Sequence, residues 1–209
     1  CLDGVDIDCE YWSGKTTNTV ISEESEGLVT ILKKLKEELL PFDLGISIDL
    51  YAAHWGGVHY FDEIVEYVDH LQVMAYDFSG PWTGPGPHSA YEDAIGSGSD
   101  VSATGLAYWV NYRGWPREKV LLGVPFYGRD FDDQNGNGMT YYDIVNIYPD
   151  AWKSDHVANI YYNGIPTMIR KVDYVLQEEF SGIMIWQITQ DHSADSLSLL
   201  NAIHQTIYP

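Results

Sequence analysis

The chain has 209 residues, of which 45% are hydrophobic and 20% charged, a composition typical of one globular domain with a sizeable core. Its 31 acidic residues outnumber the 11 basic ones, which gives a formal net charge of -20 at pH 7. Such a surface repels phosphate backbones and anionic lipids, so neither nucleic acid nor a membrane surface is an expected partner. Aromatic residues make up 14%. They fit either an aromatic core or a groove that stacks on sugar rings.

The predicted secondary structure alternates between strands and helices from the start of the chain. A polar loop follows the first strand, and Ser22 can cap a helix that Pro41 ends. A loop rich in Gly and Pro follows the third strand and is long enough to suggest a function. In chain order, the sequence predicts strands at residues 1–8, 43–52, 71–78, 119–129 and 181–188, and helices at 22–39, 59–71, 101–114, 165–180 and 193–207.

This alternation indicates the fold class. Repeated β-α units favour a parallel sheet with right-handed crossovers, in a single α/β domain that spans residues 1–209. The runs ISIDL and KVLLGVPF are nearly continuous in apolar residues, as expected for strands that helices cover. Residues 130–165 are poorly periodic, so we expect no separate insertion domain there, or only a small one.

The first strand carries an unusual concentration of acidic residues in the run DGVDIDCEYW. Alternate residues of a strand share a face, so Asp6, Asp8 and Glu10 point one way. Neighbouring carboxyl-bearing residues on this face have Cα atoms about 7 Å apart. Carboxylates so close together cannot all stay ionised cheaply, so at least one pKa must rise. The opposite face, which we expect to meet the helices, carries Val5, Ile7 and Cys9.

Glu10 is the best candidate for a proton donor among these carboxyls. It lies at the carboxyl end of its strand, which is the active-site end in a parallel α/β barrel. Two other interpretations stay open from the strand alone: a Mg or Ca site, since Asp-x-Asp-x-Glu offers oxygen ligands, and a solvated acidic edge. Asp8 and Glu10 rise side by side, so neither is placed to attack the opposite face of a sugar. A glycosidase built on them needs its nucleophile from elsewhere.

Four segments resemble the motifs of glycoside hydrolase family 18, the chitinases. DGVDIDCE resembles the D-x-x-D-x-D-x-E signature of that family, and three later segments resemble its sixth, seventh and eighth strands: MAYDFSGPW at 74–82, GVPFYGR at 123–129 and GIMIWQ at 182–187. The resemblance implies a TIM (β/α)8 barrel of which this chain carries about five β-α units, strands four to eight. We therefore expect that the first three strands are missing and that this chain alone has little or no activity.

The resemblance also implies a mechanism in which the 2-acetamido oxygen of the sugar is the nucleophile and an oxazolinium ion forms. Glu10 then protonates the leaving oxygen and later activates water. Asp8 holds the acetamide N–H, Asp6 shares a proton with Asp8 in the resting state, and Tyr76 orients the acetamide oxygen. Asp3, off the shared face, is expected to be a structural hydrogen-bond acceptor.

Further residues of the same motifs are expected to bind substrate. Alternative roles stay open for some of them: Met74 and Trp186 as core residues, Trp82 as a surface aromatic and Arg129 as part of a salt bridge. The expected substrate-binding residues are Trp186, Asp77, Met74, Tyr127, Arg129, Trp82 and Tyr11.

These expectations define a secreted hydrolase of chitin or chito-oligosaccharides that uses no cofactor or metal and has no obligate protein partner. Only 52 residues separate Arg129 from Gly182, which favours an open groove and endo-type cleavage. The alternatives are an endo-β-N-acetylglucosaminidase acting on N-glycans and a chitin-binding lectin without activity. Residues 133–138 partly resemble a calcium loop, but Ile144 stands where that loop needs a Glu, which favours a plain turn.

Overall fold

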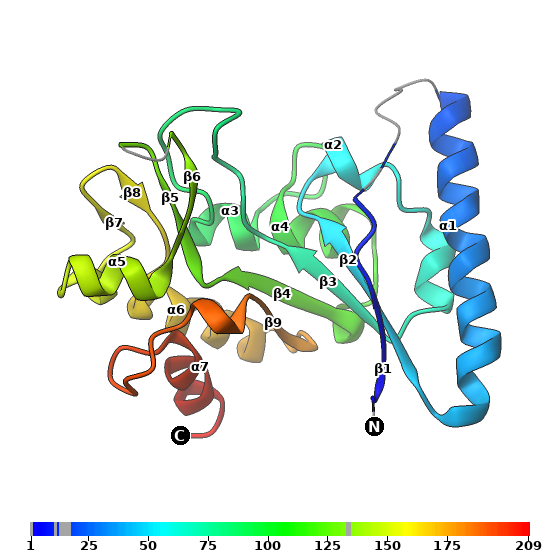
Figure 1. The fold of residues 1–209 in the computed structure, drawn as a ribbon. Coiled ribbons are helices and arrows are strands. Elements are labelled where there is room, and N and C mark those ends of the chain that lie inside the picture. Colours follow the sequence, from blue (N-terminus) through cyan, green and yellow to red (C-terminus); the bar gives the residue numbers. More distant parts are fainter. Residues whose placement is uncertain (1, 11, 13–17, 133–134) are drawn as a thin grey trace.

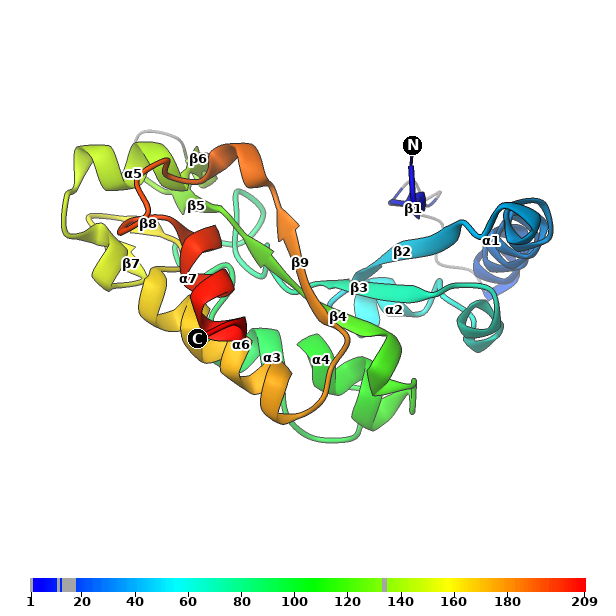
Figure 2. The same cartoon turned by 90° about the horizontal axis from the view of Figure 1, so that it is seen from below.

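The computed structural model describes residues 2–10, 12, 18–132 and 135–209. Within this part of the chain, one parallel sheet has the strand order β1-β2-β3-β4-β9. The sheet curls, with β1 at one edge and β9 at the other, and the helices lie on its outer side (Figures 1 and 2). This is half of an α/β barrel, as predicted. The strands are β1 (Gly4–Ile7), β2 (Gly45–Tyr51), β3 (His70–Met74), β4 (Val120–Pro125) and β9 (Gly182–Trp186).

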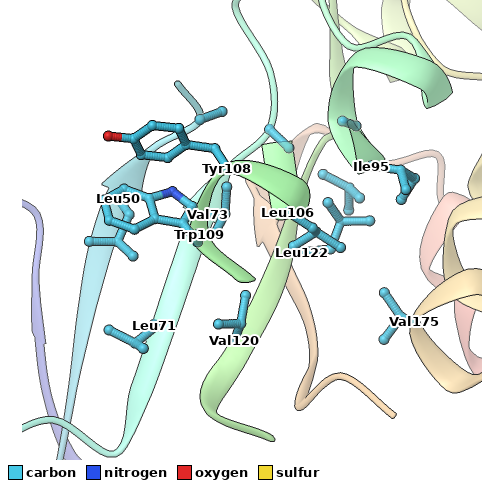
Figure 3. Close-up of a cluster of buried hydrophobic side chains, with 14 of the residues drawn as sticks. Leu50, Leu71, Val73, Ile95, Leu106, Tyr108, Trp109, Val120, Leu122 and Val175 are labelled. Carbon is cyan, nitrogen blue, oxygen red and sulfur yellow. The ribbon is translucent and has the colours of Figure 1, made fainter. Parts of the chain in front are cut away.

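Side chains alternate between the two faces of the sheet. The outer face is apolar, and Ile48, Leu71 and Leu122 on it are fully buried. Leu50, Val73 and Leu122 point from the strands toward the side where the labelled Trp109 lies (Figure 3). Burial of such side chains against the helices is the main favourable contribution to folding. The inner face carries the polar residues, and this difference places the chemistry inside the curl.

Helices connect successive strands along the chain and pack against the outer face of the sheet. The α-helices that cover the sheet are α1 (Asn18–Leu39), α2 (His54–Gly57), α3 (Tyr91–Ile95), α4 (Gly105–Ala107), α6 (Ile165–Gln177) and α7 (Leu199–Ile207), and α7 packs on α6. Short 3₁₀ turns link them: η1 (Leu40–Phe42), η2 (Asp62–Glu66), η4 (Arg117–Lys119), η5 (Ala151–Lys153) and η6 (Ile188–Gln190). Among the described residues, no helix is long and apolar enough to cross a membrane.

Two predicted helix starts are wrong. Helix α1 begins at Asn18, four residues before Ser22, whose hydroxyl bonds to Glu26 instead of capping the helix. Helix α7 begins at Leu199 and not at residue 193, because the carboxylate of Asp191 accepts the N–H group of Leu199.

Two predicted helices are much shorter than expected. The segment 59–71 forms only η2, because the side chain of Asp62 binds the indole N–H of Trp115 at 2.7 Å and the chain pairs as β3 from His70. The segment 101–114 forms α4 and a π-helical turn, η3 (Tyr108–Tyr112), after which Arg113 donates hydrogen bonds to two carbonyl groups of other elements.

The predicted strand 119–129 is two strands in different sheets. The chain leaves the parallel sheet after Pro125, and the N–H of Phe126 donates to the carbonyl oxygen of Trp186 at 2.8 Å. A second, antiparallel sheet begins at Tyr127, in the order β6-β5-β8-β7. It comprises β5 (Tyr127–Asp130), β6 (Asn137–Thr140), β7 (His156–Val157) and β8 (Ile160–Tyr161), with α5 (Tyr141–Ile147) between β6 and β7.

Candidate active site

The carboxyl ends of the parallel strands surround a cavity of about 670 Å³. It opens on the inner face of the sheet, where the parallel register puts Asp6 of β1 beside Ser47 of β2, and Asp49 of β2 beside Gln72 of β3. Eight residues that the sequence predicts for the site line this cavity: Asp8, Glu10, Met74, Tyr76, Asp77, Trp82, Tyr127 and Trp186. It is also lined by Asp49, Tyr51, Ala52, Trp55, Phe78 and Thr83, which the sequence analysis did not select.

The carboxyl groups of Asp8 and Glu10 both have raised pKa values. Partial burial raises the pKa of Asp8, and the charge of Asp6 adds to this effect. Partial burial also raises the pKa of Glu10, with a further increase from the charge of Asp8. The hydroxyl of Tyr51 donates to the backbone carbonyl oxygen of Glu10 at 3.4 Å. Glu10 is therefore the carboxyl at the strand end that stays protonated to a higher pH than a free Glu.

Asp6 is exposed and has partners on two other strands. Its Oδ1 accepts hydrogen bonds from the hydroxyl of Ser47 on β2 and from the amide nitrogen of Gln72 on β3, the latter at 2.5 Å. The Asp6 carboxyl therefore leans across β2 instead of staying over its own strand.

Asp49 on β2 is a further carboxyl of the cavity that the sequence analysis missed. Only 7% of it is exposed. Burial, together with the charges of Asp6, Asp8 and Glu10, raises its pKa to about 8. The sequence held a usable signal, because Ser47, Asp49 and Tyr51 share one face of an otherwise apolar strand.

Asp77, just after β3, binds three side chains. Tyr127 donates its hydroxyl to Asp77 Oδ1 at 2.7 Å, and Arg129 donates Nε to the same oxygen at 2.9 Å. Nδ1 of the buried His88 lies 3.4 Å from this oxygen in a poorly aligned contact. Burial works to raise the pKa of Asp77, but these three neighbours overcome it and hold the pKa at about 2. Asp77 is therefore a fixed anion on the cavity wall.

Tyr76 and Met74 lie between the carboxyls of β1 and the last strand. The Tyr76 hydroxyl contacts Sδ of Met184 on β9 at 3.9 Å. Burial raises the pKa of Tyr76, and the nearby charge of Asp49 adds to the increase. Tyr76 is therefore a neutral hydroxyl that can donate a hydrogen bond at any physiological pH.

Three tryptophans at the cavity have faces exposed enough to stack on a ligand. Trp186 at the end of β9 is 49% exposed and Trp82 is 61% exposed. The guanidinium of Arg129 lies 5.0 Å from the centre of the Trp82 ring. Trp55, which the sequence analysis did not select, is 68% exposed on α2, with its ring centre 4.7 Å from that of Tyr51. Such exposed flat rings favour a ligand with apolar C–H faces.

The remaining predicted residues lie apart from the cavity or outside the described residues. Asp3 takes part in the sheet through its backbone carbonyl oxygen, which accepts the N–H of Gly45 at 2.9 Å. Tyr11 is not among the described residues, and neither are residues 133–134 of the segment compared with a calcium loop. Across the part of the chain that the structure describes, no group of three or more His, Cys, Asp or Glu side chains is arranged to hold a metal ion.

A half-barrel with carboxyl groups and exposed tryptophans at the carboxyl ends of its strands is typical of the α/β-barrel glycoside hydrolases. The model of glycosyl hydrolases family 18 matches residues 1–191, and the chain belongs to this family. Its relatives include Endochitinase 1 of Metarhizium robertsii, which is 26% identical over 94% of this chain and 54% of that protein. Chitinase A1 of Niallia circulans is 25% identical over 96% of this chain and 36% of that protein.

Solved structures of chitinases have the same fold. The family 18 chitinase ChiB of Flavobacterium johnsoniae superposes with a TM-score of 0.81 at 32% identity, over 98% of this chain and 60% of that one. A chitinase of Bacteroides thetaiotaomicron has a TM-score of 0.81 at 26% identity, over 99% of this chain and 64% of that one. The predicted family and fold class are thus confirmed. The chain spans about half the length of the first of these relatives.

Proposed function

We propose that the protein is a chitinase that hydrolyses β-1,4 bonds between N-acetylglucosamine units. Membership of family 18 supports the class of reaction. The observation that carries the proposal is the position of Glu10, a carboxyl of raised pKa beside Asp8 at the rim of the cavity. A carboxylic acid of raised pKa can donate its proton to a leaving oxygen up to a higher pH than a free Glu.

The proposed reaction retains the configuration of the sugar and uses its own 2-acetamido group. Glu10 gives its proton to the glycosidic oxygen while the acetamide oxygen attacks the anomeric carbon, and an oxazolinium ion forms. Glu10 then takes a proton from the water that opens this ion. Asp8, beside Glu10, is the carboxylate that stabilises the positive charge and binds the acetamide N–H. Tyr76, a neutral hydroxyl on the same cavity, orients the acetamide oxygen.

Other side chains are proposed to bind the sugar. Trp186 offers its exposed face to the sugar at the cleavage site, and Trp82 stacks on the leaving-group side. Asp77 accepts a hydrogen bond from a sugar hydroxyl, while Tyr127 and Arg129 hold Asp77 in place. Arg129 presents its remaining N–H donors to the sugar, and the Tyr127 hydroxyl oxygen can accept a hydrogen bond from it. We also propose endo-type cleavage, together with an extracellular location that follows from an insoluble polymer as substrate. Comparing the medium with the cells by enzyme assay tests the location.

The replacement of Glu10 by Gln tests the proposal. In the full-length protein, Glu10→Gln should lower the hydrolysis of a fluorogenic chitobioside at least about 100-fold, because the amide has no acidic proton to donate. The matched control is Glu118→Gln, an exposed residue of η4 at the opposite end of the sheet. Equal activity of the two variants would remove Glu10 from the mechanism.

Two alternative functions predict different substrates or no reaction. An endo-β-N-acetylglucosaminidase would cleave a high-mannose glycoprotein in preference to N-acetylglucosamine oligomers. A lectin would bind the oligomers and never cleave them. Measuring cleavage of both substrates, and binding of the oligomers to Glu10→Gln, separates the three functions. Hydrolysis of the oligomers together with retained binding by the variant supports the chitinase.

A further inference from the structure

Asp49 stands in the middle of the carboxyl cluster. Its side chain lies on the inner face of β2, in register with Gln72 on β3. The groups that face it are three carboxyls from β1 and the segment just after it, and the hydroxyl of Tyr76 after β3. Because 93% of Asp49 is shielded from solvent, water cannot compensate an ionised carboxylate at this position. The three carboxyls are Asp6, Asp8 and Glu10.

The hydrogen bonds distinguish Asp49 from Asp6. Asp6 accepts two hydrogen bonds, from Ser47 and Gln72. Asp49 has an oxygen, Oδ1, that meets no hydrogen-bond donor among the described residues. A buried anion without a donor is costly, whereas a carboxylic acid at the same place needs only an acceptor. Asp6 is that acceptor, because the two side chains are within hydrogen-bonding contact.

We propose that Asp49 is a positioning residue that carries the resting proton shared among the three aspartates Asp6, Asp8 and Asp49, and donates it in a hydrogen bond to Asp6. The pair Asp49–Asp6 then takes the place of the pair Asp6–Asp8 that the resemblance to the family implies. Asp8 has no proton to share with Asp6 and stays free to face Glu10. Besides Glu10, the cluster therefore keeps one neutral carboxyl, and Asp49 adds no further negative charge beside Asp8 and Glu10.

The protonation state of Asp49 has a direct consequence for titration. With its pKa raised to about 8, Asp49 stays neutral while the carboxyls of ordinary pKa lose their protons. Replacement by Asn, which is also neutral and donates through its amide, removes no charge. Replacement by Ala removes the donor to Asp6 altogether.

Carbon-13 NMR of the full-length protein, labelled at the aspartate carboxyls, measures the protonation state without any substrate. We expect one carboxyl to titrate near pH 8 and to be missing from the spectrum of Asp49→Asn. Titration of every aspartate carboxyl below about pH 6 would overturn the proposal. This measurement needs only the unsubstituted protein if the variant fails to fold.

Kinetics test the positioning role, and only this part rests on the proposed function. In Asp49→Asn we expect the alkaline limb of the pH profile of kcat/KM to stay in place. Asp49→Ala should lower kcat about tenfold with little change in KM, and Asn should restore most of this loss. A limb that moves to lower pH in Asp49→Asn would show that Asp49 is ionised, and the proposal would be wrong. If no sugar is hydrolysed at all, the proposed function fails, but the NMR titration still shows whether Asp49 carries the proton.

Discussion

The hydroxyl of Tyr127 lies 2.7 Å from Oδ1 of Asp77, and the two residues belong to different parts of the fold. Asp77 follows β3 of the parallel sheet, whereas Tyr127 begins β5 of the antiparallel sheet. Arg129, two residues further along β5, binds the same carboxylate. These contacts hold the start of β5 against the cavity, so the small second sheet forms one wall of the proposed active site.

The anion at Asp77 should make the stability of the protein depend on acid pH. Its folded-state pKa of about 2 lies below the ordinary value of 3.8, so the stabilisation is fully present above about pH 4 and is lost as the pH falls through about 2. Near neutral pH, Asp77→Asn should lower the free energy of unfolding by about 1 to 2 kcal/mol, allowing for partial exposure of the carboxyl.

Urea unfolding at a series of pH values checks this prediction. The difference between Asp77→Asn and the unsubstituted protein should shrink toward zero near pH 2. The matched control is Asp173→Asn on the exposed side of α6, which should change the stability little at any pH. A difference for Asp77→Asn that is the same at acid and neutral pH would contradict the assigned origin of the effect.

The charge of Asp8 should set the upper end of the pH range in which Glu10 works. Asp8 raises the pKa of Glu10, so Asp8→Asn should lower that pKa and move the alkaline limb of kcat/KM to lower pH. The rate at the optimum should also fall, because the positive charge of the intermediate loses its carboxylate. The pH profile measured with a fluorogenic chitobioside gives both quantities. If the alkaline limb stays in place while the rate falls, Asp8 does not raise the pKa of Glu10, and only its role in stabilising the intermediate remains.

The sequence predicts those parts of the site that follow from the alternation of side chains within a single strand. The alternation of β1 is enough to put Asp8 and Glu10 on one face, and the structure brings both to the cavity. The same alternation on β2 would have selected Asp49. It went unnoticed because a lone Asp in an apolar run has no acidic neighbour in the sequence. Its three acidic neighbours come from β1, and only the register of the sheet brings them together.

Contacts between distant segments could not be predicted. The motifs predict Tyr127, Arg129 and Asp77 for the site, but Asp77 lies 50 residues before Tyr127 and no local pattern predicts the bond between them. The predicted helix at 59–71 has suitable apolar spacing, yet the bond from Trp115 to Asp62 and the pairing of β3 override it. Local propensity is a weak guide where tertiary contacts of this kind compete with it.

Trp55 should bind the more distant units of a long substrate. It lies on α2 beside Tyr51, at the edge of the cavity, with 68% of its surface exposed. Trp55→Ala should raise KM for a hexamer of N-acetylglucosamine about threefold to tenfold, the range expected for one aromatic stacking contact. It should leave kcat/KM for a fluorogenic chitobioside unchanged. The control is Phe42→Ala, an equally exposed aromatic on η1 before β2. Equal effects of Trp55→Ala on both substrates would place this residue at the cleavage site instead.

Lys171 on α6 should be essential for stability although it is far from the proposed chemistry. Its side chain is fully buried, and Nζ donates to the carbonyl oxygen of Ser89 at 2.9 Å, to the Ser89 hydroxyl at 2.7 Å and to Asn163 Oδ1 at 2.8 Å. The Ser89 hydroxyl in turn donates to the carbonyl oxygen of Ala75 at 2.7 Å, next to Tyr76. Lys171 therefore connects helix α6 to the end of β3, where the cavity begins.

The replacement of Lys171 by Met keeps the length of the side chain and removes its donors. It leaves Asn163 Oδ1 buried without this donor, so we expect the free energy of unfolding to fall by about 2 to 4 kcal/mol. Lys153→Met, at an exposed lysine on η5 that forms an ion pair with Asp150, should change the free energy of unfolding by less than about 1 kcal/mol. Urea unfolding of the two variants gives the comparison. If both unfold at the urea concentration of the unsubstituted protein, the buried bonds of Lys171 add nothing to stability, and α6 is then held to the sheet by apolar packing alone.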